Sequence, residues 1–278
     1  MKLGWCTDVH LDYLSPYRCE GFLNEVSAIG ADSFIITGDI STANKLEGHL
    51  SAIALKANVP VYYVLGNHDY WEGSIKSVRA LTIDLEKKYP NLIYLGNRSY
   101  VKLTDKAALV GHDGWYDAIY GDWRKSHFEM PDWYLIEEFR DAQASEKIVK
   151  DKWIINFPNA VNKSRDLAQF CAEHIEKSIQ EAIAAGFKQI LIASLVPAFE
   201  ESHMHEGKRG SDTTMCWFTS GLLGDVVMTA AISNPDIVFT IFSGHTHGDY
   251  RGSITHNLHA YVGGARYGRP CVQTTVHL

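Results

Sequence analysis

The sequence has no apolar run as long as the roughly 18 to 20 residues that a helix needs to span a bilayer. It also lacks G-x-x-x-x-G-K-[ST], G-x-G-x-x-G and G-x-S-x-G, so no P-loop, dinucleotide-binding or serine-nucleophile signature is present. An apolar strand begins almost at the first residue and leaves no room for a signal peptide before it. We therefore expect no membrane span and a cytoplasmic location.

Cysteine and positive charge are also scarce. The five cysteines are scattered, odd in number and never spaced C-x-x-C, which argues against a disulfide framework and a zinc ribbon. The net charge of −7 gives no general attraction to nucleic acid, so a nucleic-acid partner is not expected. The 278 residues contain no repeat and no Pro/Ser-rich linker, which predicts a single domain over residues 1–278.

Side chains of the types that bind metals follow directly after apolar segments of the sequence. Four segments rich in β-branched and aromatic residues have the composition of buried strands. Each ends in a short polar motif: Asp8-x-His10, Gly38-Asp39, Gly66-Asn67-His68-Asp69 or Gly244-His245-Thr246-His247. Carboxylates, imidazoles and amides at the ends of neighbouring strands can converge on one site, so the pattern predicts a metal centre.

Taken together, these motifs resemble the calcineurin-like metallophosphoesterase family. Its pattern is D-x-H, G-D, G-N-H-D/E, a lone His before a proline-containing turn, and G-H-x-H. Four of these five blocks occur here in order between residues 8 and 247. The resemblance implies an α/β fold, namely a four-layer α-β-β-α sandwich of two mixed sheets flanked by helices. It also implies hydrolysis of phosphate monoesters or diesters of small molecules or nucleotides.

The resemblance also implies two divalent metal ions, about 3.5 to 4 Å apart in such sites. The first ion would be bound by Asp8, His10, Asp39 and His247, and the second by Asp39, Asn67 and His245. Asp39 would bridge the ions because a carboxylate has two oxygens. The mixed nitrogen and oxygen ligands favour Mn, Fe, Zn or Ni over Mg or Ca.

Two further residues receive roles from the same resemblance. A hydroxide between the ions would attack phosphorus, and His68 would protonate the leaving oxygen, for which an ordinary histidine pKa of about 6.5 is suitable. Asp69 would either orient His68 or cap the turn that follows it.

The chain departs from the family pattern at Leu195. The segment Ala193-Ser194-Leu195-Val196-Pro197 places leucine where the second metal would have an imidazole. Three interpretations follow. The second site is weak and is completed by substrate oxygens; another histidine substitutes, with His112 and His205 as the candidates and His203 nearby; or the chain has lost catalysis and acts as a binding or scaffold module.

Hydrophobic periodicity places the remaining elements. It predicts helices near residues 17–30, 46–58, 74–89, 164–186 and 219–233, and a polar loop over 200–214. Alternation of strands and helices at the start predicts parallel pairing. Three short strands between residues 92 and 110 indicate a meander or a mixed sheet, and strands are also expected near 189–193, 260–262 and 272–276.

The region from 116 to about 163 is rich in aromatic residues and irregular in pattern. We interpret it as a helical insertion lying over the site, where its aromatic side chains would contact an organic leaving group. The alternative is an ordinary edge of the fold, in which these side chains are buried under its own helices.

Overall fold

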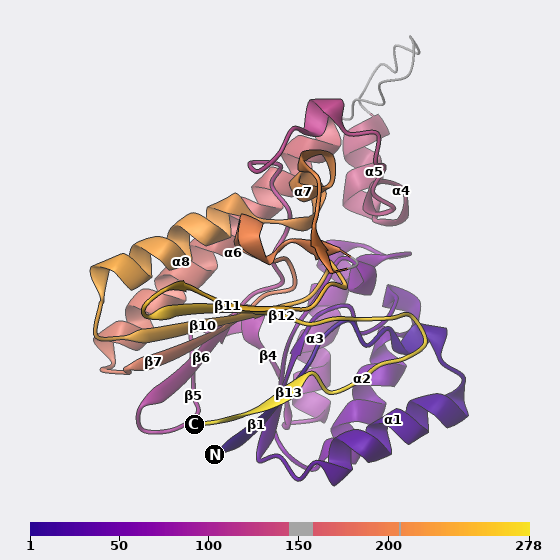
Figure 1. The fold of residues 1–278 in the computed structure, drawn as a ribbon. Coiled ribbons are helices and arrows are strands. Elements are labelled where there is room, and N and C mark those ends of the chain that lie inside the picture. The colour runs from indigo at the N-terminus through magenta and orange to yellow at the C-terminus, as the bar shows by residue number, and fades with distance from the viewer. Residues whose placement is uncertain (145–157, 206) are drawn as a thin grey trace.

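Two β-sheets form the centre of the molecule. The computed structural model describes residues 1–144, 158–205 and 207–278 (Figure 1). The first sheet has the strand order β13-β1-β2-β3-β4, made of β13 (Thr274–His277), β1 (Lys2–Cys6), β2 (Ser33–Thr37), β3 (Val61–Val64) and β4 (Leu92–Tyr94). Strands β1 to β4 are parallel, as the sequence predicts, and β13 is antiparallel to β1.

The second sheet is also mixed. Its order is β11-β12-β10-β7-β6-β5, made of β11 (Tyr250–Thr255), β12 (Leu258–Val262), β10 (Val238–Ser243), β7 (Gln189–Ala193), β6 (Ala107–Gly111) and β5 (Val101–Lys102). The inner strands β12, β10, β7 and β6 run parallel, and the two edge strands are antiparallel to their neighbours.

Helices cover the outer faces of both sheets. Helices α1 (Pro16–Ala28), α2 (Ala43–Ala57) and α3 (Ile75–Lys88) pack on the first sheet, and α6 (Pro158–Ala184) and α8 (Gly221–Ser233) pack on the second (Figure 1). A separate cluster that includes Trp5, Leu109, Leu191 and Phe242 fills the space between the sheets. The predicted α-β-β-α sandwich is therefore confirmed.

The helices begin where the sequence supplies capping groups. The Ser15 hydroxyl accepts the backbone N–H of Arg18, and Pro16 occupies the first position of α1, where no N–H is needed. Ser74 and Ser77 form a reciprocal capping box at the start of α3. These local signals lie next to the predicted starts of α1 and α3, which are each within one residue of the observed ones.

Two sequence predictions need correction, and one strand was not predicted. The strands between residues 92 and 110 are not a meander, because β4 ends the first sheet while β5 and β6 begin the second. The alternative of mixed sheets is confirmed, since both sheets combine parallel and antiparallel pairs. The loop predicted over 200–214 holds the 3-10 turn Glu200–Ser202, a small hairpin of β8 (Met204–His205) and β9 (Lys208–Arg209), and the first residues of α7 (Asp212–Phe218). Edge strand β11 was not predicted, because its exposed side chains give no apolar run.

The predicted insertion is helical in part: residues 116–122 and 126–131 are irregular, and the rest of its described residues, apart from Ile136, are in short helices or at the start of α6. After a 3-10 turn at Trp123–Lys125 come α4 (Asp132–Leu135) and α5 (Glu137–Ala144), beyond the ends of the central strands (Figure 1). Residues 145–157 of the predicted insertion, including Trp153 and Phe157, lie outside the described residues. Helix α6 begins at Pro158, earlier than the predicted residue 164.

In the part of the chain that the structure describes, no single helix is long and apolar enough to cross a membrane. Helices α7 and α8 reach that length and composition only as a pair, and the pair is bent by 73°.

Candidate metal centre

The polar motifs lie in loops that follow four of the central strands. The carboxyl ends of parallel strands meet at one edge of a sheet, so β1, β2 and β3 bring Asp8, Asp39 and Asn67 to the same place. Strand β10 of the second sheet brings His245 and His247 to it. Residues far apart in sequence thus come together because the two sheets pack face to face.

The backbone of these loops is strained. Five candidate ligands adopt left-handed conformations with positive φ that non-glycine residues rarely take: Asp8 (48°), His10 (40°), Asp39 (51°), His245 (66°) and His247 (57°). Such strain persists only where the surroundings enforce it, and it concentrates at functional sites.

The motif glycines make room for the ligands. A Cβ on Gly66 would collide with the carboxylate of Asp39, and a Cβ on Gly244 would collide with the carboxylate of Asp8. Any larger residue at either position would displace a candidate ligand, which is a physical reason for glycine in both motifs.

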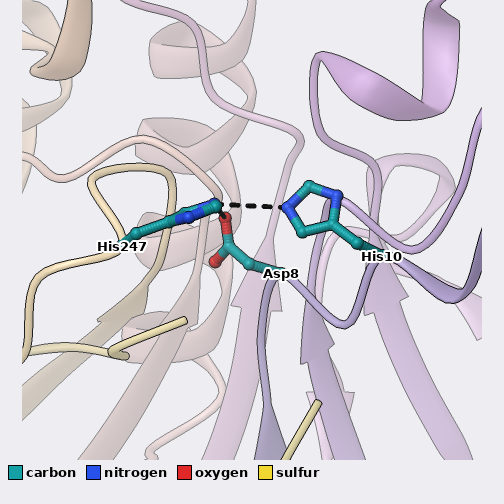
Figure 2. A group of neighbouring side chains, drawn as sticks. All are labelled: Asp8, His10 and His247. Carbon is teal, nitrogen blue, oxygen red and sulfur yellow. Dashed lines mark hydrogen bonds and ion pairs between the residues drawn. The ribbon is translucent and has the colours of Figure 1, made fainter. Parts of the chain in front are cut away.

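The candidate ligands of the first ion converge. His10 Nε2 lies 3.2 Å from His247 Nε2 and 3.9 Å from Asp39 Oδ2, and His247 Nε2 lies 3.4 Å from Asp8 Oδ1. Figure 2 shows Asp8, His10 and His247 pointing toward one another. Two imidazole nitrogens this close to each other and to carboxylate oxygens form the donor set of a transition-metal site.

The candidate ligands of the second ion have donor atoms left over from hydrogen bonding. Asn67 is buried, and its Oδ1 has no hydrogen-bond partner. His245 Nε2 lies 3.0 Å from the carbonyl oxygen of Trp217, so Nε2 carries the hydrogen and Nδ1 keeps a free lone pair. An orphaned carbonyl oxygen and a free imidazole nitrogen fit a divalent cation.

The electrostatics of the cluster also suit a cation. Burial, followed by the negative charges of Asp8 and Asp69, raises the pKa of Asp39, because ionised carboxylates crowd together there. Burial lowers the pKa of His10 to about 4 and also lowers the pKa of His245, so both imidazoles are neutral at pH 7. The raised pKa of Asp39 favours its protonated form in the metal-free protein, and a bound cation would favour the ionised form. The neutral imidazoles already have the protonation state that a metal ion requires.

His68 lies at the edge of the cluster, beside Asp39. Its Nε2 is 3.9 Å from Asp39 Oδ2, and its backbone N–H donates to Asp39 Oδ1 at 3.0 Å. The ring stacks on Trp71 with centroids 3.4 Å apart. Burial and the neighbouring imidazoles of His10, His245 and His247 lower its pKa.

Asp69 holds the loops together through backbone hydrogen bonds. Oδ1 accepts the N–H groups of Ile40 and Ser41, and Oδ2 accepts that of Gly66. His68 Nδ1 has no hydrogen-bond partner, so Asp69 does not orient the His68 ring through that atom. Asp69 instead ties the Asp39 loop to the Asn67 loop.

Leu195 occupies the space beside the second set of ligands. It is fully buried, and its Cδ2 lies 2.6 Å from the place where a Cβ of Gly66 would be. Its backbone carbonyl accepts the N–H of Gly244. The leucine therefore sits between the motif loops, where it offers packing but no ligand atom.

The candidate substitute histidines lie in three different places. His112 is buried against α6, where its Nδ1 contacts Cys171 Sγ at 2.9 Å and accepts the N–H of Asp113 at 2.8 Å. His203 lines the same cavity as His245 and stacks on Phe218. His205 belongs to β8, and its side chain is outside the described part of the structure. We therefore leave His112 out of the proposed ligand set.

A cavity of about 610 Å³ opens onto the candidate metal ligands. One wall comes from the insertion through Phe128, Met130 and Pro131, and the hairpin β8–β9 contributes Lys208 and Arg209. Tyr267 lies 4.6 Å from His10 and 5.0 Å from His247 between ring centroids and forms another part of the wall. The cavity is thus apolar on one side and basic at the hairpin.

Sequence reasoning missed several residues of this site. Trp71, Tyr267 and Asp132 all contact candidate ligands or His68, but none belongs to a motif. Trp71 follows the G-N-H-D motif after one residue, which is the one available signal. Asp132 begins α4 and Tyr267 lies in a loop near the C-terminus, both far from the motifs in sequence, and neither carries a signal in a single sequence.

The family model for calcineurin-like phosphoesterases matches residues 1–249. Among solved structures, a dimetal phosphatase from Danio rerio is similar at 12% identity, with coverage of 100% of this chain and 92% of that one and a TM-score of 0.57. A phosphopantetheinyl hydrolase from Mycobacterium tuberculosis is similar at 12% identity, with coverage of 95% and 89% and a TM-score of 0.56. At this identity the two structures show a common fold. No curated protein matches.

The family match covers the four motifs whose side chains converge in the cluster. It agrees with the mixed sheets, the strand-end loops and the donor atoms that fit divalent cations. The chain belongs to the calcineurin-like phosphoesterase family and is a metal-dependent phosphoesterase.

Proposed function

We propose that this chain binds two divalent ions and hydrolyses a phosphoester of a small organic molecule or nucleotide. Asp8, His10, Asp39 and His247 would bind the first ion, and Asp39, Asn67 and His245 the second. The observation that carries the proposal is the convergence of His10, His247 and Asp8, with Nε2 of His247 within 3.4 Å of both partners. Mn, Fe, Zn or Ni suits the donor set, and a cytoplasmic location stays a prediction from the sequence.

The chemistry divides between the ions and the side chains. When bound, the ions neutralise charge on the phosphoryl oxygens and acidify the attacking water. Asp39 faces His10 with one carboxylate oxygen and accepts the backbone N–H of His68 with the other, so it would be the ligand that the two ions share. His68 would carry the proton to the leaving oxygen from its Nε2, the nitrogen that faces Asp39.

His68 can donate a proton only when its imidazole is protonated. Its pKa is lowered by burial and by three imidazoles, so His68 is neutral in the absence of substrate. The negative charge of a bound phosphoester next to the ring would raise this pKa. The Trp71 face holds the ring in place while its protonation changes.

The cavity suggests the class of substrate. Aromatic and apolar side chains next to the candidate metal ligands could contact an organic leaving group, and Lys208 at the hairpin could pair with an additional negative charge. Arg209 is paired with Glu200 at 2.7 Å, which leaves Lys208 as the better placed of the two cations. A phosphorylated aromatic or a nucleotide meets both requirements.

Leu195 favours a second candidate, in which the chain is a catalytically weakened binding module. The second ion would have one imidazole instead of two, which weakens its site. The orphaned Oδ1 of Asn67 and the adjacent His68 favour the enzyme, because a binding module needs neither.

The test combines hydrolysis with metal analysis. Purified protein would be assayed on 4-nitrophenyl phosphate and bis(4-nitrophenyl) phosphate with added manganese, and bound metal would be measured after dialysis. We expect hydrolysis and two ions per chain at saturation. No hydrolysis together with fewer than one ion per chain would favour the binding module.

A His68→Asn variant isolates the proton donor. Loss of general acid catalysis costs about 10²- to 10⁴-fold in rate, and the loss should be greater for an alkyl phosphate than for 4-nitrophenyl phosphate, whose leaving group needs no proton. Equal rates for wild type and variant on both substrates would remove His68 from the mechanism.

A further inference from the structure

Asp132 is a buried carboxylate that no motif predicts. It is the first residue of α4 in the insertion, it is fully buried, and it reaches the metal centre from the side of the insertion. Its Oδ1 accepts Asn67 Nδ2 at 2.8 Å and Trp71 Nε1 at 2.7 Å, and its Oδ2 accepts the Tyr116 hydroxyl at 3.1 Å. Asp132 thus contacts one proposed metal ligand and the residue that supports His68.

The contact with Asn67 has a chemical consequence. A side-chain amide has an oxygen that can bind a cation and an NH₂ group that cannot, and rotation by 180° exchanges them. A carboxylate only accepts hydrogen bonds, so Asp132 can bond the NH₂ group and repels the oxygen. The Asn67 oxygen is thereby turned away from Asp132 and has no partner, as expected of a ligand atom waiting for a cation.

The contact with Trp71 extends the effect to the proton donor. The Trp71 indole N–H is anchored on the same Oδ1 that bonds Asn67, and the indole stacks under the His68 ring at 3.4 Å. Tyr116, which bonds the other oxygen, faces the His245 ring in parallel at 6.3 Å between centroids. One carboxylate from the insertion therefore contacts the loop that carries Asn67 and His68 directly and the loop that carries His245 through Tyr116.

We propose that Asp132 is a positioning residue of the second metal site, fixing the Asn67 amide with its oxygen toward the ion and the Trp71 platform under His68. The inference rests on the proposed two-metal function. Asp132 would thus give the insertion a role beyond forming the cavity wall. The position of Asn67 matters more here because Leu195 leaves the second ion with few ligands. Groups behind metal ligands typically account for about 10- to 100-fold in metal affinity.

Calorimetric titration of metal-free protein with Zn²⁺ tests the proposal in variants. In Asp132→Leu we expect the second equivalent to bind about 10- to 100-fold more weakly while the first is unchanged. Asp132→Asn keeps an oxygen that can accept from Asn67 and Trp71, so its loss should be smaller. Asp117→Asn is the matched control, since Asp117 is a buried carboxylate of the same insertion that bonds Leu222 and Ser220 rather than a metal ligand.

Unchanged binding of the second equivalent in a folded Asp132→Leu would overturn the proposal. So would a loss in Asp132→Asn as severe as in Asp132→Leu, because the carboxylate would then act as a ligand or a charge rather than as an acceptor for Asn67. Wild-type protein that takes up fewer than two ions would instead count against the proposed function.

A measurement on wild-type protein tests the proposal without any Asp132 variant. The side-chain amide of Asn67, assigned by its absence in Asn67→Asp, is followed by NMR in the metal-free protein. We expect slow hydrogen exchange, because the NH₂ group is buried and bonded to Asp132. Exchange as fast as that of exposed asparagines would contradict the positioning role.

Discussion

At the scale of single residues, the second metal site is affected by Leu195, whose side chain has no atom that can bind a metal ion. Its side chain lies against the glycines of two motif loops, so the position itself is well placed for a ligand. Because Asp39 would be shared with the first ion, the remaining ligands Asp39, Asn67 and His245 offer one carboxylate oxygen, one amide oxygen and one imidazole nitrogen. We therefore expect the second ion to bind more weakly than the first.

The substitution Leu195→His should restore an imidazole at this position. We expect the second ion to bind at least about tenfold more tightly, a gain comparable to that from groups that hydrogen-bond to metal ligands. Activity should then saturate at a lower manganese concentration. Leu195→Phe is the control, because it adds a ring without a donor atom. Identical metal titrations for the histidine and phenylalanine variants would show that this position does not face the second ion.

Gly244→Ala should damage the first ion site. An added methyl group would collide with the carboxylate of Asp8 and the hydroxyl of Thr7, so Asp8 has to move away from His247. We expect weaker binding of the first ion and loss of most activity, measured by metal titration and by hydrolysis of 4-nitrophenyl phosphate. Gly48→Ala, where a Cβ meets open space on α2, is the control. Normal metal binding in Gly244→Ala would mean that Asp8 does not need its observed position.

At the scale of elements, the sequence predicts what short-range patterns encode. The strand β7 is predicted with its observed bounds because a continuous apolar run encodes it, and the motif loops follow from glycine and polar residues at strand ends. Helix α7 and the β8–β9 hairpin escape prediction because they are short, and their positions depend on packing against distant segments. The role of Asp132 depends on contacts with Asn67, 65 residues away, which no local pattern shows.

The insertion provides a second testable element. Phe128 is 43% exposed and lines the cavity, so it is available to an organic leaving group. Phe128→Ala should raise KM for an aromatic phosphoester several-fold, since a ring contact contributes about 0.5–1.5 kcal/mol, and should leave inhibition by inorganic phosphate unchanged. Tyr134→Ala is the control, because Tyr134 is similarly exposed in α4 but does not line the cavity. If Phe128→Ala and Tyr134→Ala had the same KM, the leaving group would not bind against Phe128.

At the scale of the whole molecule, a buried polar network joins the two sheets near the metal centre. Asp113, which follows β6, accepts the Leu65 N–H and the hydroxyls of Tyr70 and Tyr94, and it pairs with Arg79 of α3 at 2.8 Å. His112 precedes it and packs against α6. This network fixes the second sheet to the loop that carries Asn67.

The network predicts sensitivity to acid. Burial lowers the pKa of His112 to about 3, although the charge of Asp113 opposes the shift. The unfolded chain binds a proton at about pH 6.5 and the folded one only near pH 3, so stability present at neutral pH is lost as the pH falls through that range. The slope for one such group is about 1.4 kcal/mol per pH unit.

His112→Asn removes this titration and keeps an acceptor for the Asp113 N–H. Urea unfolding of metal-free protein between pH 4 and 7 should show a shallower loss of stability in the variant than in the wild type. Parallel curves for the two proteins would contradict a neutral, buried His112.

The central claim is that side chains from four strand ends bind a pair of metal ions, and anomalous scattering from crystals grown with manganese tests it most directly. The account predicts two peaks that share the carboxylate of Asp39. One would also contact Asp8, His10 and His247, and the other Asn67 and His245. An absence of density at this cluster, or a single ion bound away from Asp39, would contradict it.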